Sequence, residues 1–162
     1  MRQLNGQIGF LLGNRRGGYL SLSGRPASRY LGFFVRKNNK MLRVLENIEP
    51  DHYDVMKVVQ KFWCVERQCQ GTTMFRERYF PVQDTDAFVY ESDAVQWLSL
   101  HFDVKESYDS RQYGRSYEVT EEDGALLVHF TKKTDPREDA SSDVQEFSLW
   151  CAVAAKAPSE FK

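Results

Sequence analysis

The chain has 162 residues, of which 41% are hydrophobic and 14% aromatic, and its formal net charge is -1. This length suits one ordinary domain, and the apolar and aromatic content excludes an intrinsically disordered chain. No run approaches the roughly 18 apolar residues of a membrane span, and the N-terminus lacks a secretory signal segment. We therefore expect one folded domain over residues 1–155, a linker or trimmed end over 156–162, and a soluble cytoplasmic protein that contacts no membrane.

Charge is distributed unevenly along the chain. Residues 1–45 hold nine Lys or Arg and no Asp or Glu, so all 23 acidic residues follow them. A basic segment of this kind binds nucleic acid or phosphate, or it docks onto the acidic part of its own fold. We favour docking and keep nucleic-acid binding as the less favoured alternative.

Alternation with a period of two dominates the chain and predicts β-strands. Leu98, Leu100 and Phe102, for example, alternate with polar residues, as a half-buried strand requires. Together with runs rich in aromatic and β-branched residues, this pattern predicts ten strands. In chain order they are Gln7–Leu12, Tyr19–Ser23, Tyr30–Arg36, Met41–Glu46, Thr72–Phe80, Ala87–Glu91, Leu98–Val104, Tyr113–Thr120, Leu126–Thr131 and Phe147–Val153.

The stretch Asp51–Trp63 fits two interpretations. Its apolar residues, among them Val55, Val58 and Phe62, fall at helical spacing. The β-branched members favour a strand instead, because branching at Cβ restricts the side chain in a helix. We predict a strand over Val58–Arg67.

Turn signals separate the predicted strands at Lys37–Lys40, Gln70–Gly71, Pro81–Asp86 and Glu121–Gly124. Asp123-Gly124 is the strongest hairpin signal, because both residues accept the positive φ of a tight turn. Many strands with short links predict an all-β fold with little helix, a sandwich of two antiparallel sheets. A closed barrel around a ligand cavity is the alternative.

The three cysteines, Cys64, Cys69 and Cys151, are odd in number and scattered in position. They predict reduced thiols packed mostly in the core rather than a disulfide framework. No second Cys or His pair follows at zinc spacing, so we expect neither a metal site nor a cofactor. The polar stretch Thr134–Asp143 predicts a surface loop.

The stretch Phe10–Gly24, FLLGNRRGGYLSLSG, joins two predicted strands through a glycine-rich turn. A phosphate-binding loop needs a Lys and then a Ser or Thr directly after its last glycine, but here Tyr19 follows Gly18. The stretch is therefore interpreted as a hairpin turn, in which Gly17 and Gly18 supply positive φ.

The segment Tyr108–Val119, YDSRQYGRSYEV, interleaves tyrosines with charged side chains. Aromatic faces beside planar hydrogen-bonding groups suit a sugar ring, and aromatic residues with arginine also suit nucleic-acid bases. An ion-paired strand edge with half-buried tyrosines is the alternative interpretation, since such surface pairs are common.

Three stretches resemble the start of prokaryotic glycogen debranching enzymes of the amylo-α-1,6-glucosidase type. They are LLGNRRGGYLSLSG, SRYLGFFV and VLENIE, and YDSRQYGRSYEV is similar to a segment of archaeal members. The resemblance rests on an Asn-x-x-Gly-Gly turn and on an Arg shortly before a Gly and an apolar strand. In this chain these are Asn14, Gly17, Gly18, Arg29, Gly32, Phe33, Phe34 and Val35. One position departs, because many members have a His where this chain has Leu31.

The resemblance implies a supersandwich-like β-sandwich that precedes a helical toroid, and it places the catalytic carboxylates in the toroid. The chain would then be the noncatalytic, substrate-side or scaffolding domain of an enzyme that acts on α-1,6 branches. Its implied partners are an α-glucan (glycogen or a malto-oligosaccharide) and the toroid domain, in the same or a separate chain. The residues expected to contact the glucan or the toroid are Asn14, Arg15, Gly17, Gly18, Arg29, Tyr30, Tyr113 and Arg115. An independent carbohydrate-binding module and a nucleic-acid-binding domain are the alternatives.

Overall fold

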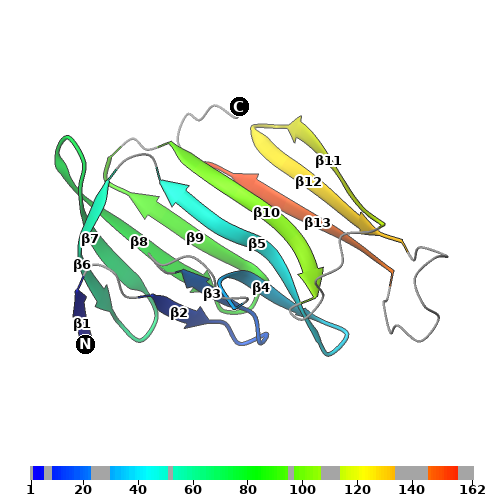
Figure 1. The fold of residues 1–162 in the computed structure, drawn as a ribbon, viewed down its shortest axis with the longest axis horizontal. Coiled ribbons are helices and arrows are strands. Elements are labelled where there is room, and N and C mark those ends of the chain that lie inside the picture. The colour runs from blue at the N-terminus through cyan, green and yellow to red at the C-terminus, as the bar shows by residue number, and fades with distance from the viewer. Residues whose placement is uncertain are drawn as a thin grey trace. The chain divides into compact units, whose positions relative to one another are not determined.

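The computed structural model describes residues 2–5, 9–22, 30–50, 53–94, 97–106, 114–133 and 146–156. These ranges contain thirteen β-strands and no helix, and the paired strands run antiparallel (Figure 1). The predicted all-β class is confirmed. By their contacts the strands fall into two units, Met1–Asp109 and Ser110–Lys162, which are described separately. A single domain over 1–155 stays a prediction.

The strands of the first unit form the two sheets of a sandwich-like fold, and the strands of the second unit form one small sheet. The first unit holds β1 Arg2–Asn5, β2 Phe10–Gly13, β3 Tyr19–Leu22, β4 Gly32–Lys37, β5 Lys40–Pro50, β6 Asp54–Gln60, β7 Val65–Gln70, β8 Met74–Val82, β9 Ala87–Ser92 and β10 Leu98–Glu106. The second unit holds β11 Arg115–Glu122, β12 Ala125–Lys132 and β13 Phe147–Ala154.

Two five-stranded sheets build the first unit. Sheet I has the order β1-β6-β7-β8-β9, and sheet II has the order β10-β5-β4-β3-β2. Aromatic rings join them in the core: Phe10 lies 5.4 Å from Tyr79, and Phe33 lies 5.0 Å from Phe88, between ring centroids. Both sheets keep two open edges in the described chain, so the unit is a sandwich-like fold and the closed-barrel alternative is wrong.

Sheet III, with the order β11-β12-β13, builds the second unit. Its central strand alternates as predicted, with Val128, Phe130 and Lys132 buried on one face. On the other face His129 stacks on Trp150, with 4.2 Å between the ring centroids. The residues Thr134–Asp143, predicted as a loop between β12 and β13, lie outside the described residues.

The prediction of one strand over Val58–Arg67 is wrong. The chain turns back at residues 61–64, where the Lys61 amide donates to the Cys64 carbonyl at 2.8 Å, so that β6 and β7 form a hairpin. The helical spacing before the turn has a simple cause. A bulge between Val55 and Lys57 shifts the alternation of β6, so that its apolar residues no longer follow a period of two.

The predicted turn chemistry is confirmed at two hairpins and corrected at a third. Asn38 and Asn39, and likewise Asp123 and Gly124, have positive φ, as two-residue hairpin turns require. At the third hairpin Gly17 has a φ of 86°, whereas Gly18 is not among the residues with positive φ. Gly18 is needed for space instead, because a Cβ there would lie 2.8 Å from the Phe34 carbonyl oxygen.

The cysteines agree with the prediction of free thiols, since Cys64 and Cys69 are buried and Cys151 is half-buried. The short strand β1, which pairs with β6, was not predicted. In the described part of the chain no helix is long and apolar enough to cross a membrane.

Candidate binding face on sheet I

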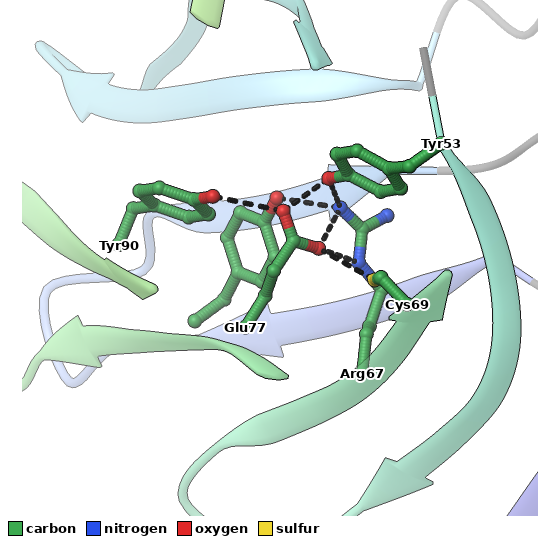
Figure 2. Close-up of polar contacts among 6 residues, drawn as sticks. Tyr53, Arg67, Cys69, Glu77 and Tyr90 are labelled. Carbon is green, nitrogen blue, oxygen red and sulfur yellow. Dashed lines mark hydrogen bonds and ion pairs between the residues drawn. The ribbon is translucent and has the colours of Figure 1, made fainter. Parts of the chain in front are cut away.

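A buried ion pair joins β7 to β8 on the inner face of sheet I. Glu77 and Arg67 are cross-strand partners, and both Nε and one terminal nitrogen of Arg67 contact Oε2 of Glu77, at 2.8 and 2.6 Å (Figure 2). The Glu77 side chain is 0% exposed. A carboxylate at such depth needs a full set of partners, because an unpaired buried charge is costly.

Two tyrosines and a cysteine complete that set. The hydroxyls of Tyr53 and Tyr90 donate to Oε1 of Glu77, the latter at 2.8 Å, and the Cys69 thiol lies 3.4 Å from Oε2 (Figure 2). Arg67 in turn donates to the hydroxyl of Tyr79 at 2.7 Å. The network thus ties together β7, β8, β9 and the residue just before β6.

Burial raises the pKa values of the thiol and of the phenols in this network. Desolvation, followed by the negative charge of Glu77, raises the pKa of Cys69 to about 12. The pKa values of Tyr53 and Tyr90 also lie above their ordinary value, first because of burial. The pKa of Arg67 is raised as well: burial lowers it, but the neighbouring Tyr79 and Glu77 raise it by more. The thiol and phenols therefore stay neutral near pH 7.

The same strands carry charged side chains on their outer face, because successive residues of a strand point to opposite sides. Glu66 on β7, Arg78 on β8 and Glu91 on β9 are cross-strand neighbours in one row. Arg78 Nε donates to Glu91 at 2.8 Å, while Glu66 accepts from Lys61 at 2.6 Å. These groups border an open hollow of about 300 Å³. It is lined by Glu66, Arg76, Glu77, Arg78, Glu91, Ser92 and Asp93.

An aromatic rim adjoins this hollow at the β6–β7 turn. Trp63 is 51% exposed, and its ring lies 6.4 Å from that of Phe80 on β8. The Arg78 guanidinium, which lines the hollow, lies 5.6 Å from the centre of the Phe80 ring. At the tip of the turn Phe62 is fully exposed. Contiguous exposed apolar surface beside polar groups is typical of a binding surface.

The charge of the hollow is mixed. Glu66, Glu91 and Asp93 supply carboxylates, and Arg76 and Arg78 supply guanidinium groups. Such groups donate and accept hydrogen bonds side by side, while aromatic rings offer an apolar face. The arrangement suits a neutral, hydroxyl-rich ligand better than a polyanion, which the carboxylates would repel.

Asn14 and Arg15, which the sequence predicts as site residues, lie in the turn between β2 and β3. Asn14 ties its own turn together, because its side-chain oxygen accepts from the Gly18 amide at 2.8 Å and its side-chain nitrogen donates to the Thr85 carbonyl at 2.9 Å. Arg15 lies 4.0 Å from Asp84. The turn at 14–18 thus packs against the turn that joins β8 to β9.

Two of the remaining predicted residues lie in the described part of the chain. Tyr30 is exposed just before β4, and Arg115 begins β11 in the second unit. Arg29 and Tyr113 lie outside the described residues. A role of these residues in binding stays a prediction.

The docking interpretation of the basic N-terminal segment has direct support. Arg16 pairs with Asp86 at 3.3 Å, and the buried Arg43 pairs with Asp103 on β10. Burial raises the pKa of Asp103, but Lys105 and Arg43 lower it by more, so the net shift is downward. Arg16 and Arg43 of the segment are therefore paired with acidic residues of the same chain.

Sequence reasoning missed the outer face of sheet I. Its one signal was the pair Phe62-Trp63 at the tip of a turn, where Gly, Asn, Asp or Ser would be ordinary. No family model matches the chain, and no curated protein or solved structure matches it either. Among the described residues no three His, Cys, Asp or Glu side chains gather as a metal site.

Proposed function

We propose that the chain is a noncatalytic module that binds a neutral α-glucan on the outer face of sheet I. The observation that carries the proposal is the aromatic pair Trp63 and Phe80 beside a hollow with carboxylates and guanidinium groups. An indole or phenyl face stacks on the apolar face of a sugar ring, and the charged groups bond its hydroxyls.

We infer that the module is one domain of a larger enzyme. The resemblance to the start of glycogen debranching enzymes favours a substrate-side or scaffolding domain that works with a helical toroid carrying the catalytic carboxylates. The buried Glu77 is consistent with a noncatalytic role, because both of its carboxylate oxygens are bonded to neighbouring side chains and its side chain is not exposed to solvent. An independent carbohydrate-binding module is the second candidate, and the aromatic rim favours it equally.

Calorimetric titration of the protein with maltohexaose tests the binding proposal. We expect a Kd in the millimolar range, about -4 kcal/mol, since an open face leaves much of a ligand in water. Trp63→Ala should weaken binding at least fivefold, because it removes the rim.

Trp150→Ala is the matched control, since Trp150 is 63% exposed and lies on β13 in the second unit. Its affinity should equal that of the unmodified protein. Equal affinity of the Trp63→Ala variant and the unmodified protein would contradict the proposed face.

A further inference from the structure

We propose that this face takes a linear chain of at least three sugar residues laid along β8, and not a single sugar ring. This inference rests on the proposed function and concerns the length of the ligand. It begins from the order of the outward-pointing residues on one strand. Arg76, Arg78 and Phe80 follow one another at intervals of two, so the outer two lie roughly 13 Å apart at the usual rise of a strand. That distance clearly exceeds the width of one sugar ring.

The two ends of this row differ in chemistry. At one end Arg76 lies beside Ser92 and Asp93 in the hollow, where Asp93 also accepts from the Arg76 amide at 2.6 Å. At the other end Phe80 and Trp63 form the aromatic rim. Arg78 belongs to both, because it lines the hollow and lies over the Phe80 ring.

Neither the hollow nor the aromatic rim is sufficient by itself to bind a sugar tightly. The hollow, at about 300 Å³, is at the lower limit of small-molecule sites and is open to solvent. The rim offers ring faces with few hydrogen-bonding groups. A ligand that covers both ends adds stacking to hydrogen bonding without a second loss of translational freedom. Binding should therefore strengthen steeply with chain length until both ends are covered.

The buried network on the inner side of sheet I fixes the positions of the two ends of this row. Glu77 lies between Arg76 and Arg78 in the sequence of β8, and it is bonded to Arg67 on β7 and to Tyr90 on β9. The strands that carry the row are thus cross-linked from the inner side. A face fixed in this way loses little conformational freedom when an extended chain binds.

The test is a series of titrations with glucose, maltose, maltotriose and maltohexaose. We expect the Kd to fall at least tenfold from glucose to maltotriose. Arg76→Ala should reduce the affinity for maltotriose to that for maltose, because one end of the row is removed. Arg36→Ala is the control, since Arg36 is an exposed arginine on sheet II whose side chain contacts Asn39.

The outcomes separate the two proposals. Similar affinities for glucose and maltotriose, with Trp63 still required, overturn the inference about length and leave the proposed function intact. Retention of the full length dependence by Arg76→Ala also overturns it. Absence of binding for the whole series contradicts the proposed function, and the inference then fails with it.

Discussion

Arg67 and Glu77 face each other across β7 and β8 and meet through two contacts, 2.8 and 2.6 Å long, inside the sandwich (Figure 2). Their neighbours in sequence, Glu66 and Arg78, point outward as a second cross-strand pair. One register therefore sets both the buried network and the proposed binding face. Disrupting the inner pair should disturb the outer face as well.

The first prediction concerns this buried pair. Glu77→Ala should lower the free energy of unfolding by about 3 to 5 kcal/mol, because it leaves the Arg67 charge buried without its partner. Urea unfolding measures the change. Glu91→Ala is the control and should have a far smaller effect, since Glu91 and Arg78 are both partly exposed. Equal losses in the two variants would contradict the importance of the inner pair.

The second prediction concerns alkaline pH. The pKa of Cys69 is about 12 in the folded protein and about 8.5 in an unfolded chain. A raised pKa in the folded state stabilises the protein below the unfolded value, and this contribution is lost as the pH rises toward 12. The Cys69 thiol therefore lowers the free energy of unfolding by about 1.4 kcal/mol for each pH unit above pH 9.

Cys69→Ala should consequently show a shallower decline of the free energy of unfolding between pH 9 and 10 than the unmodified protein. Urea unfolding at several pH values under reducing conditions measures both slopes. Identical slopes would show that the Cys69 thiol is not held in its neutral form.

The third prediction separates two glycines of one hairpin. Gly18→Ala should destabilise the protein by about 1 to 3 kcal/mol, because the new Cβ would lie 2.8 Å from the Phe34 carbonyl oxygen. Gly13→Ala should be tolerated, since its nearest atom would be 3.8 Å away. Thermal unfolding of both variants checks the difference, and a reversed order would contradict the close approach of β3 and β4.

The fourth prediction concerns the two polar residues of the same turn. Asn14→Ala should lower the free energy of unfolding by about 1 to 2 kcal/mol, because two hydrogen bonds are lost. Arg15→Ala should change it by less than about 0.5 kcal/mol, since its 4.0 Å contact with Asp84 joins two exposed side chains. Equal effects in thermal unfolding would mean that the turn is held differently.

Alternation in the sequence was sufficient to predict most strands, because a half-buried strand must change sides at each residue. It failed at the β6–β7 hairpin for two local reasons. The bulge between Val55 and Lys57 breaks the period, and the turn carries Phe62 and Trp63 instead of the usual Gly, Asn, Asp or Ser. Because the turn is itself apolar, the hydrophobic pattern continues from β6 into β7 and does not show where the turn lies.

The candidate site was less accessible to sequence reasoning than the fold. Trp63, Arg78 and Glu91 come from three separate segments, and only the register of β7, β8 and β9 brings their surroundings together. The turn at 14–18 is conspicuous in the sequence through its glycines and arginines. The structure gives its Asn14 and Arg15 contacts with the β8–β9 turn instead.

We propose that the outer face of sheet I binds a neutral glucan. The most direct test is to follow the backbone amide signals of the protein by NMR during titration with maltohexaose. We expect the largest shifts at Glu66, Arg78 and Glu91 and at the indole of Trp63. Shifts confined to the turn at residues 14–18, or no shifts at millimolar sugar, would contradict it.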